Sequence, residues 1–413
     1  MKRWAARLAL AAVSVLVAVG ALEFALRLCS DEAKGQVTER VDPILGRVKA
    51  SGRGLVYRKR DAYNIYDTNS EGFYDRERAK EKPPGVFRIA VIGDSFIDAV
   101  QVPFESTLSQ RLEKALSRPE RPVEVLNFGR GGTSLPEYRL LLEHWALAYD
   151  PDLVLVFVYN ENDLDDLRPD AIPQVNGKYV RPVYAWENGR LLLKDYSPPA
   201  LEASHAAGKP RSALLHLVRE RVWNHPRVVS WMVNAGLMDG SQLYSRGVLV
   251  NADGYPTLYN VYRVSPPDQA EWQYAFDLAG HILQDMASLC AEHGARFAVA
   301  SIPSQFEVHG ALRSELFHAY PAMAKEKWDF EQVSNRLEES LGRHAIPFLR
   351  LDRPLRSLAL AAGDKPLYFK FNAHWNSVGN AAAASAVEDF IAQNGLAQGT
   401  AFAGASHQQG GPD

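Results

Sequence analysis

The sequence predicts a three-layer α/β domain, because short apolar runs alternate with segments of helical spacing. Five runs are rich in β-branched or aromatic residues: 87–92, 123–127, 153–158, 296–302 and 347–351. Segments with helical spacing or length follow at 108–116, 267–293 and 378–394. Nearly continuous apolar strands separated by helices indicate a mostly parallel five-stranded sheet that is covered on both faces.

Composition narrows the class of protein. The 413 residues include 46 Lys and Arg against 49 Asp and Glu, a net charge of -3, which gives no electrostatic basis for binding nucleic acid. The hydrophobic share of 46% and the charged share of 23% are those of an ordinary globular chain. The two cysteines, Cys29 and Cys290, argue against a disulfide framework or a thiolate metal site.

Residues 1–30 have the pattern of an export signal. Basic residues up to Arg7 precede a charge-free apolar run at 8–22. An uncleaved signal anchor, a single transmembrane helix in the inner membrane, fits this pattern best, and positive charge before the run places the rest of the chain on the extracytoplasmic side. Two alternatives stay open: a signal cleaved near 18–20, and a buried core helix.

The organisation beyond the anchor is expected to have four parts. Residues 31–85 are polar and turn-rich and predict a stalk or collar, and the core domain spans 86–395. An insertion at 164–265 follows the third strand and breaks the strand–helix rhythm. We expect it to be a lid or substrate subdomain, with membrane-surface contact as the alternative. The tail at 396–413 lacks periodicity and predicts disorder.

A serine lies directly after the first predicted strand, in Gly93-Asp94-Ser95. A strand-to-helix turn can present its hydroxyl at the carboxyl edge of the sheet, where the amides of the next helix face a developing oxyanion. This position suits a nucleophile. Taken alone, the tripeptide is equally a loop and a helix cap.

Three further blocks end the other strands or precede the last helix. Residues 127–132 form a glycine-rich loop that lacks the dinucleotide and P-loop fingerprints. Asn162 follows the third strand, where its amide can donate to an oxyanion or close an Asx turn. His374 lies just before the last helix, where it can reach the same edge of the sheet.

In this order the four blocks resemble the SGNH or GDSL family of serine hydrolases and acyltransferases. The resemblance implies a flavodoxin-like sandwich, no cofactor and no metal. It also implies that Ser95 is the nucleophile, that His374 is the general base, and that the Ser95 amide, Gly132 and Asn162 form the oxyanion hole. Asn160 stands where the family usually has glycine. The side chains expected to contact the substrate are Asp94, Asn160 and Trp375.

Residues 302–305 and 374–376 resemble the membrane-anchored members and the polysaccharide O-acetyltransferase branch. This likeness implies an esterase or acyltransferase that acts on an O-acyl group, O-acetyl above all, of a glycan or a small ester. A transferase would require a multi-span membrane partner to supply the acyl donor. The alternative from another class is a weakened protein that serves as a glycan-binding or assembly factor.

One position departs from the family pattern. The acetyltransferase-like branch has an aspartate two residues before the histidine, and here that residue is Asn372. A carboxylate would orient the imidazole and stabilise the imidazolium, whereas an amide only accepts the hydrogen bond. Three interpretations remain: Asn372 suffices, Asp364 substitutes for the missing carboxylate, or the enzyme is weakened.

The remaining polar residues are less informative. Asp163, Asp165 and Asp166 could bind a cation, but a solvated loop end is the expected arrangement. His293, His309 and His318 lack the close helical pairing of a zinc site, so no metal site is predicted.

Overall fold

The computed structural model describes residues 2–29, 39–59, 62–169, 171–172, 174–175, 178–179, 181–197, 212–218, 231, 235, 237, 255–266, 268–361, 363, 366–369 and 372–397. The chain divides into two compact units. One comprises Met1–Val37 with Pro199–Thr257, and the other comprises Thr38–Pro198 with Leu258–Asp413. The second unit contains the sheet and the four sequence blocks described above.

The larger unit is built on a five-stranded parallel sheet. The strand order is β13-β12-β7-β5-β6, so the first strand of this sheet, β5, lies between the second and the third. This is the flavodoxin-like order, in which ligands bind at the carboxyl ends beside the point where the order reverses. The predicted sheet is confirmed. Its strands are β5 (Phe87–Gly93), β6 (Val123–Gly129), β7 (Leu153–Tyr159), β12 (Arg296–Ile302) and β13 (Phe348–Arg350).

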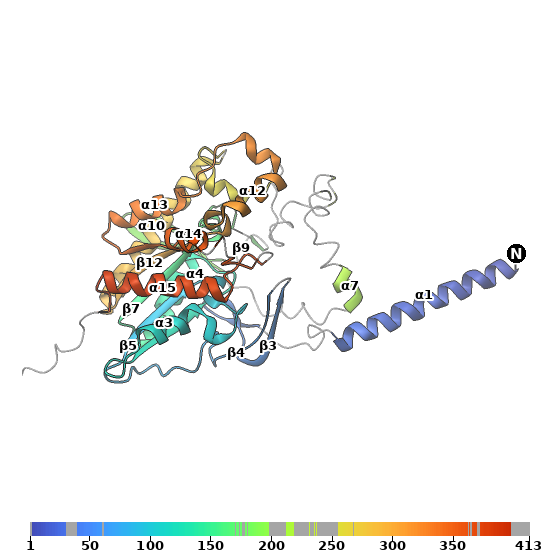
Figure 1. Cartoon of the computed structure of the whole chain (residues 1–413), viewed down its shortest axis with the longest axis horizontal. Coiled ribbons are helices and arrows are strands. Elements are labelled where there is room, and N and C mark those ends of the chain that lie inside the picture. The colour runs from blue at the N-terminus through green and yellow to red at the C-terminus, as the bar shows by residue number, and fades with distance from the viewer. Residues whose placement is uncertain are drawn as a thin grey trace, which may run out of the picture. The chain divides into compact units, whose positions relative to one another are not determined.

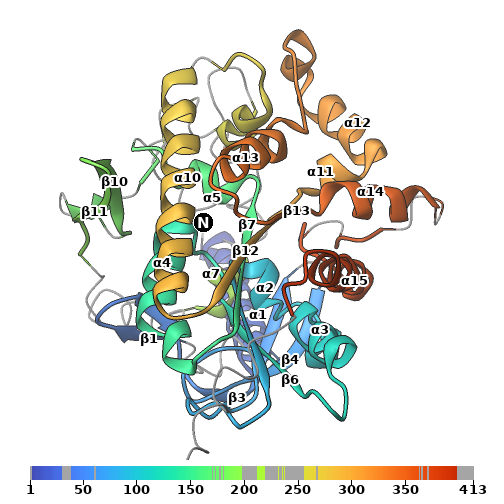
Figure 2. The ribbon, with the colours of Figure 1, turned by 90° about the vertical axis from the view of Figure 1, so that its left-hand side faces the viewer.

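Helices cover both faces of the sheet, as Figure 2 shows. Every residue of β5 and β7 is buried, which explains why these strands are continuously apolar rather than alternating. One face carries α3 (Leu108–Leu116), α14 (Asp352–Ala361) and α15 (Ser377–Gln393). The other carries α4 (Leu135–His144), α10 (Gln269–Glu292) and α13 (Gln332–Gly342).

Short helices follow the carboxyl ends of several strands. The most relevant are α2 (Ser95–Asp98), which continues directly from β5, and α5 (Asn162–Asp165), which follows β7. The others in this unit are η2 (Phe104–Ser106), η3 (Ala146–Tyr149), α11 (Gln305–Val308), α12 (Gly310–Ala319) and η6 (Pro321–Lys325).

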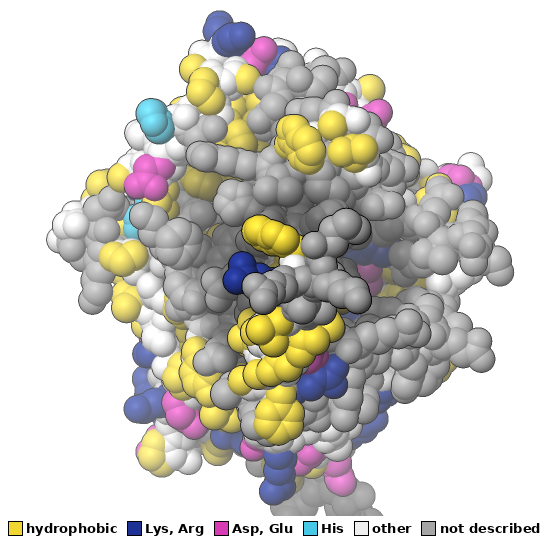
Figure 3. All heavy atoms as spheres, turned by 90° about the vertical axis from the view of Figure 1, so that its right-hand side faces the viewer, with side chains coloured by type: hydrophobic (Ala, Val, Ile, Leu, Met, Phe, Trp, Pro, Cys, Tyr) yellow, Lys and Arg dark blue, Asp and Glu magenta, His cyan; other side chains and the backbone are white. Residues whose placement is uncertain are grey.

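The N-terminal helix α1 (Lys2–Cys29) is the one described helix that is long and apolar enough to cross a membrane (Figure 1). Its window Leu10–Arg27 has a mean hydropathy of 1.9, and none of that window is buried. Large exposed hydrophobic side chains concentrate on this helix. Figure 3, drawn from the right-hand side of Figure 1, shows hydrophobic side chains gathered near the centre of the view. Length and hydropathy therefore permit a signal anchor.

Two antiparallel hairpins precede β5 in the chain. The first pairs β1 (Glu39–Asp42) with β2 (Gly46–Lys49), and the second pairs β3 (Gly52–Lys59) with β4 (Ala62–Thr68). We call these hairpins the collar. They occupy part of the predicted stalk or collar at 31–85.

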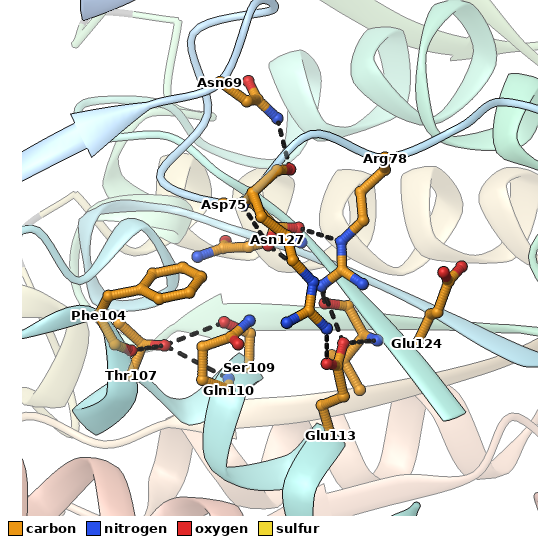
Figure 4. Close-up of polar contacts among 12 residues, drawn as sticks. Asn69, Asp75, Arg78, Phe104, Thr107, Ser109, Gln110, Glu113, Glu124 and Asn127 are labelled. Atoms are coloured by element: carbon orange, nitrogen blue, oxygen red, sulfur yellow. Dashed lines mark hydrogen bonds and ion pairs between the residues drawn. The ribbon is translucent and has the colours of Figure 1, made fainter. Parts of the chain in front are cut away.

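A buried ionic cluster joins the segment after the collar to β6 and α3 (Figure 4). Arg78 lies 3.1 Å from an oxygen of Asp75 and 2.8 Å from an oxygen of Glu113. The amide of Asn127 donates to Asp75 over 3.1 Å. The Asn127 side chain also donates to the backbone oxygen of Ile97 in α2 over 3.0 Å, so the cluster holds the carboxyl end of β6 against the helix that begins at the serine.

Only parts of the predicted insertion at 164–265 are among the described residues, and its role as a lid or subdomain stays a prediction. The described elements are β8 (Gln174–Val175), β9 (Lys178–Tyr179), β10 (Val183–Glu187), β11 (Arg190–Asp195), α7 (Ala213–Val218) and η5 (Thr257–Tyr262). The tail from 398 onward lies outside the described residues, as does Asp364.

Candidate active site

Ser95 and His374 meet at the carboxyl edge of the sheet. Ser95 is the first residue of α2, and its Oγ lies 2.7 Å from Nε2 of His374. The two residues are 279 positions apart in the sequence. Both side chains are partly exposed, whereas the residues next to Ser95 are buried. The fold therefore presents one hydroxyl, in contact with one imidazole, at the surface of the sheet edge.

The tautomer of His374 is fixed by its other nitrogen. Nδ1 lies 2.9 Å from the backbone oxygen of Asn372 and 2.5 Å from its side-chain oxygen. A backbone oxygen can only accept, so Nδ1 carries the proton and Nε2 presents its lone pair to Ser95. Asn372 Nδ2 then points away and donates to the hydroxyl of Tyr57 over 2.8 Å. The side-chain oxygen and the backbone oxygen of Asn372 thus orient the imidazole.

Aromatic packing holds the imidazole in place. The ring of Phe96, the residue after the serine, lies 4.8 Å from the ring of His374 between centroids. Trp375 meets the same phenyl ring edge-on at 5.1 Å. Because Phe96 and Trp375 are both almost fully buried, the position of His374 is coupled to the hydrophobic core.

The loop at 129–132, which we call the glycine loop, lies against the serine. A Cβ on Gly131 would be 3.6 Å from the Cβ of Ser95. Arg130 donates its amide to the Gly93 backbone oxygen over 2.9 Å, and Gly131 donates its amide to Asp98 over 3.3 Å. Gly132 has a φ of 76°, a left-handed conformation that glycine adopts without strain.

Two backbone amides at this point have no hydrogen-bond acceptor within the described part of the chain. Among the described residues, neither the amide of Ser95 nor that of Gly132 donates a hydrogen bond. The first is at the N-terminus of α2, where an amide has no partner within the helix. Both amides therefore remain able to bind an anion or a polarised carbonyl oxygen.

Asn162 begins α5 at the end of the neighbouring strand β7, and its side chain is exposed. No hydrogen bond joins that side chain to another described residue. It is therefore an amide donor on the same edge of the sheet as the serine.

The structure corrects the three predicted substrate contacts. Asp94, Asn160 and Trp375 are exposed by only 2%, 0% and 1%, so none presents a surface to a ligand. Asp94 instead caps α2 by accepting the amide of Phe96 over 2.9 Å. Asn160 donates its side-chain amide to Glu307 over 2.8 Å. All three side chains support the site from the core.

The acidic residues after β7 are also not a solvated loop end. Asp163 is fully buried and accepts hydrogen bonds from the Tyr138 hydroxyl and the amide of Tyr159. Asp165 pairs with Arg168 over 3.2 Å. The prediction of solvation was wrong because each carboxylate has a donor inside the fold. Within the described residues, no cluster of three or more His, Cys, Asp or Glu side chains could hold a metal ion.

Arg181, from the predicted insertion, joins two parts of the site. Its guanidinium donates to the Gly132 backbone oxygen over 3.2 Å and to Glu137 over 2.8 Å, and it pairs with Asp166 over 2.5 Å. It therefore connects the glycine loop to the segment that follows α5. No sequence motif predicts the role of this residue or of Tyr57, because the contacts of both residues join distant parts of the chain.

Carboxylates crowd the region behind the serine. Burial, together with the charges of Asp98 and Asp166, raises the pKa of Asp94 to about 7. Burial, with the charge of Asp94 as the next contribution, raises the pKa of Asp163 well above its ordinary value. One oxygen of Asp94 has no hydrogen-bond partner among the described residues. Ionising these groups together is unfavourable.

Comparison with known proteins gives similarity in solved structures alone. No family model matches the chain, and no curated protein matches it. An acetyl xylan esterase structure is 12% identical with a TM-score of 0.39, over 74% of this chain and 100% of that one. An acetylxylan esterase from Geobacillus stearothermophilus is 11% identical (TM-score 0.37, 74% and 94%). A lipase/acylhydrolase from Enterococcus faecalis is 11% identical (TM-score 0.35, 75% and 96%). Because these TM-scores are below 0.5, the similarities carry no function over to this chain.

The chain's own geometry agrees with the sequence resemblance. The strand order, the serine at the turn after the first strand of the sheet, the glycine loop after the second and the histidine before the last helix are arranged as the resemblance to the SGNH/GDSL family implies. They are the features that the sequence blocks predict.

Proposed function

We propose that the chain is an exported, membrane-anchored serine esterase or acyltransferase that acts on an O-acyl group through an acyl-enzyme on Ser95. The observation that carries the proposal is the 2.7 Å contact between Ser95 Oγ and His374 Nε2, made by a histidine whose tautomer is fixed for accepting a proton. A nucleophile within hydrogen-bond reach of an oriented base is the signature of covalent catalysis.

The reaction follows from this geometry. His374 Nε2 takes the proton of the Ser95 hydroxyl as Oγ attacks the carbonyl carbon of the ester. The carbonyl oxygen becomes an oxyanion, to which the amides of Ser95 and Gly132 and the side chain of Asn162 donate. The imidazolium then returns the proton to the leaving alcohol, and water or a sugar hydroxyl releases the acyl group from Ser95 by the same steps.

The substrate class is supported by the sequence likeness to the polysaccharide O-acetyltransferase branch. We propose an O-acetyl group of a glycan as the physiological ester. The basic residues before the apolar run of α1 support an extracytoplasmic catalytic domain held at the inner membrane. A glycan outside the cytoplasm is within reach of an enzyme in that location.

Acetate release tests this proposal. The full chain in detergent is incubated with an O-acetylated oligosaccharide and with p-nitrophenyl acetate, beside Ser95→Ala. We expect release that Ser95→Ala lowers at least about 10³-fold. Equal release by both proteins would overturn the proposal. Free acetate without an added acceptor indicates a hydrolase, and acetyl transfer to an added oligosaccharide indicates a transferase.

Asn372 favours a second candidate, a glycan-binding or assembly protein that has lost most of its catalysis. The amide supplies no charge to stabilise an imidazolium. Binding of an oligosaccharide that Ser95→Ala leaves unchanged, with no turnover of any ester by the wild type, would support this candidate over the first.

A further inference from the structure

We propose that Lys49 of the collar is a positioning residue for the proposed acyl transfer, holding the glycine loop through Asp98 and cancelling the charge of that carboxylate beside the oxyanion. This inference rests on the proposed function. It makes the collar, which precedes the catalytic sheet in the sequence, a part of the active site.

The contacts form a chain from the collar to the serine. Lys49 is the last residue of β2, and its ammonium group pairs with both oxygens of Asp98. Asp98 is the last residue of α2, the helix that begins at Ser95. One of its oxygens accepts the amide of Gly131 over 3.3 Å. Asp98 therefore fixes the residue immediately before the proposed oxyanion donor Gly132.

Burial makes the charge of this carboxylate matter. The side chain of Asp98 is only 2% exposed and that of Lys49 is 21% exposed, so solvent screens the pair poorly. Without Lys49, the negative charge of Asp98 would be uncompensated. That charge contacts the Gly131 amide, which is next in the chain to the Gly132 amide that donates to the oxyanion. The same charge would oppose the transition state more than the ground state, because the oxyanion exists only in the former.

The effect on turnover distinguishes this role of Lys49 from a role in folding alone. A lysine that only holds the collar in place would affect folding and leave turnover of the folded protein unchanged. A lysine that cancels Asp98 would affect turnover, and removing the carboxylate charge would restore it.

The chain offers a matched control. Lys82 pairs with Asp152 over 2.9 Å, and its side chain is 20% exposed, close to the value for Lys49. Asp152 immediately precedes β7, so this pair lies at the amino end of the sheet, opposite the serine. Lys82 also pairs with Asp150 over 3.1 Å. Lys82→Met therefore removes a lysine of matched exposure together with its ion pairs, without touching the glycine loop.

The experiment compares Lys49→Met, Asp98→Asn, the double variant, Lys49→Arg and Lys82→Met in the full chain. Turnover of p-nitrophenyl acetate and thermal unfolding are measured for each. We expect Lys49→Met to lower kcat about tenfold, with KM unchanged within a factor of about two. Lys49→Arg and Lys82→Met should keep kcat within about threefold of the wild type.

The double variant decides the inference. Asparagine at 98 can still accept a hydrogen bond from the Gly131 amide but carries no charge. The kcat of the double variant should therefore be at least about threefold higher than that of Lys49→Met. The inference would be overturned if the kcat losses of Lys49→Met and Asp98→Asn multiply in the double variant. It would also be overturned if Lys49→Met and Lys82→Met have equal kcat. No turnover by the wild type would instead overturn the proposed function, and this inference with it.

Discussion

The two sides of the candidate site are built from different chemistry. On the base side, His374 Nδ1 contacts the backbone and side-chain oxygens of Asn372, and the hydroxyl of Tyr57 accepts a hydrogen bond from the Asn372 amide; these three groups are neutral. The oxyanion side comprises the Ser95 amide, the glycine loop, α5 and the charged residues behind them. There, buried carboxylates such as Asp98 are paired with the cations Lys49 and Arg181.

The difference separates two tasks that a triad carboxylate usually combines. Orientation of the imidazole needs only acceptors at Nδ1, which Asn372 provides twice. Stabilising the imidazolium needs negative charge, which these contacts do not supply. The oxyanion side has the opposite requirement, because negative charge near the oxyanion must be cancelled. Its cations come from the collar and from the predicted insertion.

The largest effect is expected at Arg181. Arg181→Met leaves Glu137 and Asp166 without their shared cation, which should cost about 3 kcal/mol of unfolding free energy and lower turnover as well. Chemical denaturation and acetate release measure the two effects. Arg139 pairs with Asp285 and is similarly buried: its side chain is 15% exposed, against 17% for Arg181. Arg139→Met is therefore the control. A loss of stability without any loss of turnover would remove Arg181 from the oxyanion side.

The next effect is a dependence of stability on pH. The pKa of Asp94 is about 7 in the folded state and about 3.9 in an unfolded chain, so unfolding releases a proton between these values. The free energy of unfolding should therefore fall as pH rises from about 4 to about 7, by at most about 1.4 kcal/mol per pH unit from this group.

Asp94→Asn keeps the oxygen that caps α2 and should flatten this slope. Denaturation at pH 4.5, 5.5, 6.5 and 7.5 measures it, with the exposed Asp195→Asn as control. If Asp94→Asn leaves the slope of unfolding free energy against pH unchanged, the raised pKa of Asp94 on the oxyanion side would be contradicted.

A smaller effect is expected from adding a negative charge on the base side. Asn372→Asp preserves the acceptor for His374 Nδ1 and adds a negative charge beside the imidazolium. Because the tautomer is already fixed in the wild type, we expect kcat to rise only about tenfold. Asn372→Ala should lower kcat by removing one of two acceptors. Steady-state turnover of p-nitrophenyl acetate measures both, and a decrease in Asn372→Asp would show that the base side does not lack charge.

The smallest effect is expected at Tyr57. Tyr57→Phe removes the partner of Asn372 Nδ2, but the backbone oxygen still fixes the tautomer, so kcat should fall by less than about threefold. A tenfold or greater loss would mean that the collar hydroxyl, rather than the backbone, orients the base. Tyr63→Phe, at an exposed position of β4, is the control.

The parts of this arrangement that the sequence predicts are those encoded in short contiguous blocks. Strand, turn and helix signals fall within a few residues of Ser95 and Gly132, so their place at the carboxyl edge follows from the alternation of strands and helices. His374 is predicted by its position before the last helix. The cap formed by Asp94 is equally local, although the sequence resemblance predicts a substrate contact for this residue.

The parts that the sequence does not predict depend on long-range packing. Tyr57 and Asn372 are 315 positions apart, and Lys49 and Asp98 are 49 apart. No periodicity or motif relates such residues. A signal was present at Asp98, because a carboxylate in the otherwise apolar segment after the serine requires a buried partner. Asp163 gives no such signal, because the residues around it, 160–166, are mostly polar.

Fluorophosphonate labelling of the full chain, mapped by mass spectrometry, tests the central claim most directly. The reagent needs an activated serine and no knowledge of the substrate. We expect a label on Ser95 in the wild type that is lost in His374→Ala and retained in Asn372→Asp. An unlabelled but folded wild-type chain, or a label on Ser95 that persists in His374→Ala, would contradict the claim that this Ser–His pair is a working nucleophile and base.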